Sequence, residues 1–208
     1  MEKEEVIVRT SKNRELTELA LLNAVNTLIE DEGFENLGVN AVAAKAGVSK
    51  MLIYRYFDSL DGLIAAYIQK YDYWINLEPE LPDTEHLGDF IKELFRNQIR
   101  MLRNDYTLRR LYRWELSAKN KVIKELRERR EAKGMWLVGA VSRLTNRLES
   151  EISIMATILS ASISYLVLLE ETCPVYNGIK LQSEDGWEQL ENGLDKIIDN
   201  WVNNGNHE

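Results

Sequence analysis

The sequence predicts an all-α protein in which a three-helix N-terminal domain, residues 1–58, precedes a C-terminal helical bundle, residues 59–208. Apolar residues recur at helical spacing along most of the chain, and no segment alternates apolar and polar residues as a half-buried strand does. Only three prolines and eleven glycines are present in 208 residues, so long helices meet few breaks. Residues 39–57 have the spacing of two short helices that cross at a tight turn. Together these observations favour helices packed on helices.

The first predicted helix is amphipathic and covers residues 14–32, after a charged arm at residues 1–13 that we expect to be flexible. Its buried stripe consists of apolar residues at helical spacing, namely Leu16, Leu19, Ala20, Val25, Leu28 and Ile29.

The junction between the two crossing helices carries the residue types that a tight turn requires. Ala43 is small enough for the second helix to pack closely across the first, and Gly47 can take the positive φ that ends a helix. Ser49 is a good N-cap for the helix that follows. The buried side of the pair is expected to consist of Val42, Val48, Ile53 and Phe57. This pattern predicts a helix-turn-helix, whose second helix normally enters the major groove of DNA.

The rest of the chain is predicted to be helical with clear interruptions. A fourth helix starts at an N-cap, Ser59, and reaches about Asn76, and residues 78–83 break the pattern with two prolines. Five bundle helices follow, at residues 84–104, 105–118, 120–148, 149–172 and 184–203. Residues 173–178 are predicted to form a loop.

The charge is unevenly distributed along the chain. The net charge is −8, whereas non-specific DNA affinity comes mainly from Lys and Arg side chains that meet phosphates. Residues 96–133 contain thirteen basic and five acidic residues, a local net charge of +8. This run is either a solvated helical face with i,i+4 ion pairs or a surface that attracts anions. A single cysteine and an N-terminus without an apolar signal core indicate a cytoplasmic protein.

One stretch, residues 152–169, has eighteen residues without a charge, which is the lower limit for a helix that spans a membrane. It also contains hydroxyl side chains, at Ser153, Thr157, Ser160, Ser162 and Ser164. A helix that is apolar nearly all round is equally what a subunit interface requires. We therefore predict a homodimer without membrane contact, in which residues 149–172 and 184–203 of each subunit form a four-helix interface.

Three consecutive motifs occur in and after the helix-turn-helix. They are residues 43–49 (AAKAGVS), 54–57 (YRYF) and 58–63 (DSLDGL), and the helix before them contains LLNA at 21–24 and EGF at 32–34. Together they closely resemble the TetR family of bacterial transcriptional regulators. The resemblance covers residues 14–64, and beyond it only length and helical layout match. It implies a ligand-responsive regulator, more specifically a repressor, that binds palindromic double-stranded operator DNA as a homodimer.

The resemblance also implies which residues contact DNA. By position these are Asn40, Lys50, Met51, Leu52, Tyr54, Arg55 and Tyr56. Lys50 can reach a phosphate or a guanine edge, Tyr54 can hydrogen-bond a phosphate, and Asn40 can pair with an adenine. Arg55 either points toward the DNA backbone or pairs with an acidic residue.

Several positions depart from the family pattern. Gly38 stands where members usually have a Thr or Ser cap, Met51 and Leu52 replace a small polar pair, and Leu60 replaces a phosphate-binding Lys. Residues 1–60 contain seven basic and ten acidic residues, a net charge of −3. Met51 and Leu52 can instead contact thymine methyl groups. The alternative is a helical sensor that has lost strong operator binding and acts through protein partners.

An effector of unknown identity is expected in the C-terminal bundle, as the resemblance implies. The candidate lining residues are Tyr67, Tyr71, Trp74, Phe90, Phe95, Gln98, Met101, Trp114, Met135, Trp136 and Tyr165. Large aromatic side chains with a few polar groups suit a mostly apolar cavity, although each residue can also be plain core. No nucleophile–base pair, phosphate-binding glycine loop or metal-ligand cluster stands out, so we expect no enzymatic activity, cofactor or metal.

Overall fold

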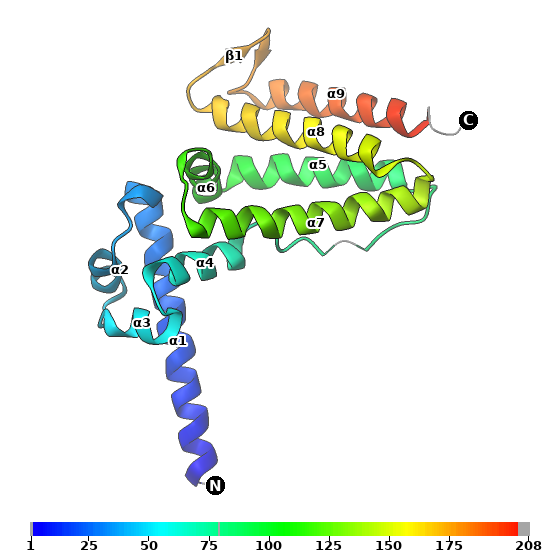
Figure 1. Cartoon of the computed structure of the whole chain (residues 1–208). Coiled ribbons are helices and arrows are strands. Elements are labelled where there is room, and N and C mark those ends of the chain that lie inside the picture. The colour runs from blue at the N-terminus through cyan, green and yellow to red at the C-terminus, as the bar shows by residue number, and fades with distance from the viewer. Residues whose placement is uncertain (1, 79, 204–208) are drawn as a thin grey trace. The chain divides into compact units, whose positions relative to one another are not determined.

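A computed structural model describes residues 2–78 and 80–203, with side chains from residue 13 onward, and confirms the all-α fold class (Figure 1). These residues form nine α-helices, one 3₁₀ turn and one small hairpin. In chain order the elements are α1 (Glu2–Glu32), η1 (Phe34–Asn36), α2 (Val39–Ala46), α3 (Met51–Phe57), α4 (Leu60–Tyr71), α5 (Leu87–Asn104), α6 (Tyr106–Ser117), α7 (Lys121–Thr145), α8 (Glu149–Glu170), β1 (Val175–Tyr176), β2 (Ile179–Lys180) and α9 (Glu184–Asn203).

The chain divides into two compact units. The first contains the residues up to Asp72 together with Arg110–Glu128, and the second contains Tyr73–Arg109 together with the residues from Arg129 onward. The boundary after residue 58 stays a prediction from the sequence. Each unit has its own buried side chains and is described separately.

In the first unit, α1 packs against α2 and α4. Leu21, Val25 and Ile29 are completely buried, as a helical stripe at i, i+4 and i+8 requires. Two expectations were wrong. The helix begins at Glu2, so residues 2–12 are not an irregular arm, and Leu16 and Leu19 are exposed. The apolar stripe is covered only from Leu21 onward, because the preceding turns of α1 extend beyond the helices on which it packs.

The turn between α2 and α3 has the predicted geometry. Gly47 has a φ of 66°, and the N–H of Val48 donates to the Ala43 carbonyl at 3.0 Å, which closes the end of α2. The N-cap position of α3 is Lys50 rather than Ser49, but the Ser49 hydroxyl accepts the Met51 N–H at 3.3 Å. Ser49 therefore still satisfies a backbone donor at the start of α3.

Helix α4 starts at the predicted cap and ends earlier than expected. The Ser59 hydroxyl accepts the Gly62 N–H at 3.0 Å, whereas the helix stops at Tyr71, and residues 73–76 form a turn. The reason lies in the second unit, where Tyr73 packs near α5 and donates its hydroxyl to the Leu94 carbonyl at 3.2 Å. Burial raises the pKa of Tyr73 to about 12.

In the second unit, α5 packs against both α8 and α9 (Figure 1). One buried cluster joins α5, α7 and α8 through Leu87, Val138, Val141 and Ile152. Phe90, Ile91, Leu144 and Trp201 pack around this cluster. The helix predicted at residues 184–203 is observed with exactly these ends as α9.

The segment predicted as a loop at residues 173–178 contains half of an antiparallel hairpin, so the loop expectation was incomplete. Val175 faces Lys180, and Tyr176 faces Ile179. The two turn residues, Asn177 and Gly178, have φ values of 50° and 85°. A two-residue Asn-Gly turn with positive φ at both positions matches the right-handed twist of short strands. The Asn-Gly pair is the sequence signal that predicts this hairpin.

Candidate nucleic-acid interface

Helix α3 has one packed face and one exposed face. Ile53 is completely buried and packs in the same unit as Val42, also completely buried, and Ala43. On the other side, Met51 is 65% exposed and Tyr54 is 45% exposed. Because these two residues are three positions apart, they lie on the same side of the helix. The buried face therefore positions α3, and the exposed face is available to a partner.

The other predicted contacts on α3 differ in accessibility. Lys50 and Arg55 are exposed, whereas Leu52 and Tyr56 are half-buried. The Tyr56 ring lies 5.2 Å from the Arg14 guanidinium and 5.9 Å from that of Arg55. These cation–π distances indicate that Tyr56 helps hold two basic side chains on one side of the domain. Tyr56 is thus better placed to orient Arg14 and Arg55 than to reach a base.

The two departures before and after α3 are visible in the structure. Gly38 is the N-cap of α2 and makes no side-chain cap, as expected from its lack of a side chain. Asn40, in the first turn of α2, is exposed. Leu60 is the first residue of α4 and is half-buried. A lysine at this position is therefore replaced by an apolar side chain that contributes to packing.

The basic run at residues 96–133 is largely matched by carboxylates. In the second unit Arg96 pairs with Asp195, and Arg100 pairs with Glu93 at 3.3 Å. Two i,i+4 pairs, Lys121–Glu125 and Lys124–Glu128, and the pair Arg127–Glu115 occur in the first unit. These pairs support a solvated, ion-paired helical face over a free anion-attracting surface.

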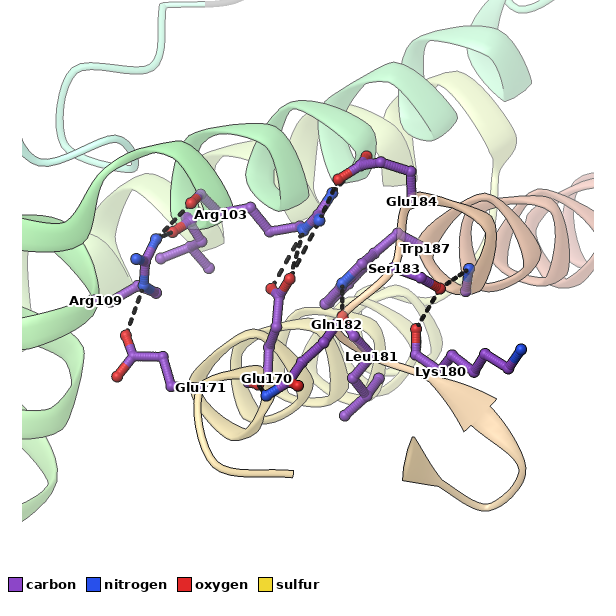
Figure 2. A network of polar contacts seen from close by, with 12 residues as sticks. Arg103, Arg109, Glu170, Glu171, Lys180, Leu181, Gln182, Ser183, Glu184 and Trp187 are labelled. Atoms are coloured by element: carbon purple, nitrogen blue, oxygen red, sulfur yellow. Dashed lines mark hydrogen bonds and ion pairs between the residues drawn. The ribbon is translucent and has the colours of Figure 1, made fainter. Parts of the chain in front are cut away.

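The densest part of this network joins the ends of α5, α8 and α9 (Figure 2). Arg103 donates to Glu170 at 3.1 Å and to Glu184 at 2.7 Å, and its guanidinium lies 5.0 Å from the Trp187 ring. The hydrogen bond to Glu184 is the largest cause that raises the pKa of Arg103. Arg109 donates to Glu171 at 3.0 Å and to the Leu102 carbonyl at 2.9 Å. The arginines thus tie three helix ends together.

These side chains border a pocket of about 610 Å³ in the second unit. Its lining is mostly charged and consists of Glu93, Arg96, Ile99, Arg100, Arg103, Asn104, Arg109, Val167, Glu170, Glu171, Gln182, Glu184 and Glu191. None of the predicted effector residues is among them. Sequence analysis missed this pocket because its arginines come from one segment and most of its acids from another more than sixty residues away. Only tertiary packing places the two sets together.

The predicted effector residues are divided between the two units. In the first, Tyr67 and Trp114 are buried around Phe34, whose ring stacks on that of Trp114 at 4.8 Å. The Tyr67 hydroxyl donates to the Asn26 side chain at 2.6 Å, and its ring lies 4.9 Å from that of Tyr71, which is exposed. In this unit, the buried members serve the core.

In the second unit, Phe95 and Gln98 are buried, Phe90 and Trp74 are half-buried, and the remaining members are exposed. The exposed members are Met101, Met135, Trp136 and Tyr165. The Gln98 amide nitrogen donates to the Ser160 and Ser164 hydroxyls at 3.1 and 3.2 Å, which joins α5 to α8. Gln98 is therefore a polar link within the helix pair. The effector assignment stays a prediction.

Helix α8 is, among the described residues, the one helix long and apolar enough to cross a membrane, by length and composition. Only 22% of its apolar window is buried within the chain. Exposed apolar side chains occur at Ile154, Ile158 and Tyr165, which lie within a 40° arc at 100° per residue. Ile197 on α9 is also exposed. No group of three metal-ligating side chains occurs in the described part of the chain.

The fold and the α2–α3 geometry define a class of protein: a regulator in which a helix-turn-helix precedes a helical bundle. Residues 21–67 match the model of the bacterial regulatory proteins of the TetR family. Similar in fold is a TetR family transcription regulator from Marinobacter aquaeolei VT8, with a TM-score of 0.62 and 18% identity over 89% of this chain and 97% of that one. A search of curated proteins finds no match.

The chain belongs to the TetR family of transcription regulators. The resemblance seen in the sequence is thereby confirmed, and so is the assignment to DNA-binding transcription regulation. Members of this family are regulators rather than enzymes. They bind DNA and typically act as dimers with small-molecule effectors.

Proposed function

We propose that the protein is a cytoplasmic, homodimeric repressor that binds a palindromic operator through α2 and α3 and is released by a small-molecule effector. One observation carries this proposal. The inner face of α3 is held by the completely buried Ile53, while Lys50, Met51, Tyr54 and Arg55 are exposed on the same short helix. A helix-turn-helix presents its second helix to the major groove in this way.

The proposed contacts are few, and their chemistry predicts the binding properties. Lys50 is the exposed cation at the start of α3, and Arg14 and Arg55 are held near the Tyr56 ring. The net charge of −3 over residues 1–60 opposes the approach of DNA. We therefore expect specific binding of modest affinity that falls steeply as salt increases.

Replacing Lys50 with alanine is expected to weaken binding to a selected duplex about tenfold at low salt, the equivalent of about 1.4 kcal/mol. The operator is first obtained by selection from random duplexes with the purified protein, and affinity is then measured by fluorescence anisotropy. Each lost phosphate contact is expected to reduce the slope of log K against log salt by about 0.9, so a dimer loses about 1.8.

Lys196→Ala removes an equal charge from an exposed position on α9 and serves as the matched control. It is expected to leave the salt slope unchanged. If Lys50→Ala and Lys196→Ala bind alike, Lys50 is not a contact. If no duplex is selected even at low salt, operator binding is refuted and the sensor that acts through protein partners is favoured.

The proposed dimer interface uses residues 149–172 and 184–203 of each subunit. The exposed apolar stripe of α8 supports it, because such a stripe is stable in water when a second copy covers it. The same stripe explains why α8 has the composition of a membrane helix, since one face packs on α5 and another packs on a partner.

Replacing Ile158 with aspartate is expected to convert the dimer to a monomer at micromolar concentration in analytical ultracentrifugation, because a charge in the centre of an apolar interface is desolvated without a partner. Val175→Asp introduces the same charge at an exposed apolar residue of β1, outside the proposed interface, and is expected to leave the dimer intact. A monomeric parent protein, or a dimer that survives Ile158→Asp, would contradict this interface.

The proposed effector acts by shifting the population between two arrangements of the dimer. One arrangement spaces the two α3 helices to match the operator half-sites, and the effector binds the other one better. By this proposal an effector is any compound that releases the dimer from the selected duplex without dissociating the subunits.

A further inference from the structure

We propose that Met51 reads the C5-methyl group of a thymine in each operator half-site, and that this apolar contact determines part of the sequence specificity. The inference rests on the proposed function, in which α3 enters the major groove. It goes beyond that function because it assigns a base, an atom of that base and a single reading side chain.

The exposure of Met51 has no explanation in the packing of the domain. The side chain is 65% exposed, whereas Ile53, two positions further along and on the opposite face, is completely buried. Leu52 is half-buried. Met51 is therefore the apolar side chain of α3 that is most available to a partner, and Tyr54 is beside it on the outer face.

The backbone around Met51 is fixed by hydrogen bonds. Its N–H donates to the Ser49 hydroxyl at 3.3 Å, the Leu52 N–H donates to the Ser49 carbonyl at 2.9 Å, and the Ile53 N–H donates to the Lys50 carbonyl at 3.1 Å. A side chain on the first turn leans toward the N-terminal end of its helix. In helix-turn-helix proteins, residues at this end of the second helix contact base edges.

The chemistry of the side chain selects the base feature that it can read. Methionine has no N–H or O–H donor, and its sulfur is only a weak acceptor. It therefore cannot replace the hydrogen bonds of a guanine or an adenine edge. The C5-methyl group of thymine is the apolar feature that the bases present in the major groove. A flexible, polarisable thioether packs well on such a group.

The test uses deoxyuridine, which pairs like thymidine and lacks only the methyl group. Each thymine of the selected operator is replaced in turn, in both half-sites, and the affinity of the parent protein is measured at constant salt. We expect one position to weaken binding about fourfold per half-site, the equivalent of about 0.8 kcal/mol per buried methyl group. The other positions are expected to change little.

The same series is then repeated with Met51→Ala, whose expected signature is loss of the penalty at that one position. Tyr54→Phe, a variant of the neighbouring exposed side chain, is expected to keep the penalty. Because Met51 is exposed, Met51→Ala is expected to fold normally, which circular dichroism verifies.

The possible outcomes separate this inference from the proposed function. Binding of the parent protein without any dependence on thymine methyl groups overturns the inference and leaves operator binding intact. An equal penalty in the parent protein and in Met51→Ala also overturns it, because another side chain then reads the methyl group. Failure to select any duplex overturns both proposals.

Discussion

Replacing Trp187 with alanine is expected to lower the free energy of unfolding by about 3–5 kcal/mol, the largest effect of any single substitution considered. Trp187 is only 2% exposed, and its indole N–H donates to the Leu181 carbonyl at 2.8 Å. Its ring also lies under the Arg103 guanidinium at 5.0 Å (Figure 2). The alanine variant loses the buried ring, leaves a cavity and removes the donor for a buried carbonyl.

Chemical denaturation followed by circular dichroism measures this effect. Trp187→Phe keeps most of the apolar volume and removes the N–H, so a smaller loss of about 1–2 kcal/mol is expected. Trp136→Ala truncates a tryptophan that is 46% exposed and is expected to cost far less. If Trp187→Ala and Trp136→Ala destabilise the protein equally, Trp187 does not anchor the start of α9.

Replacing Gly62 with alanine is expected to destabilise the first unit by about 3 kcal/mol and to abolish specific DNA binding. A Cβ atom at Gly62 would lie 1.9 Å from the carbonyl oxygen of Phe57, the last residue of α3. That oxygen belongs to the backbone, so the clash is relieved only if α3 and α4 move apart. The same movement displaces the exposed residues of α3 from the groove.

Gly134→Ala is the matched control, because Gly134 lies within α7 and a Cβ atom there meets nothing within 4 Å. This variant is expected to stabilise the protein by about 0.5–1 kcal/mol, since alanine is the better helix former. Thermal unfolding and the anisotropy assay give both readouts. A Gly62→Ala variant with parental stability would show that the contact between α3 and α4 is not close.

Local signals were sufficient for much of the N-terminal unit. Gly47 takes the positive φ predicted for it, Ser59 caps α4, and Val42 and Ile53 are completely buried. Each of these features depends on the backbone conformation or on neighbours within a few residues. Where a local signal was overlooked, as with Asn177 and Gly178, the resulting hairpin was missed although the sequence contained the evidence for it.

Periodicity was less informative about which apolar residues are covered. Leu16 and Leu19 continue the stripe of α1 perfectly, and both are exposed, because burial requires a second element at the same place. The effector candidates show the same limit. Gln98 is completely buried as a link between α5 and α8, whereas Met101, one turn later, is exposed.

The sequence by itself determined the all-α class, the helix-turn-helix and the family, because helix periodicity, caps and turns are properties of short segments. Only the tertiary structure decided how the charges of residues 96–133 are used. Arg103 and Arg109 find their carboxylates on Glu170, Glu171 and Glu184, more than sixty residues away. It also decided which apolar residue of α3 is exposed, since Met51 and Ile53 differ only in the side of the helix that packing covers. Interactions between distant segments depend on packing, and packing has no local signature in the chain.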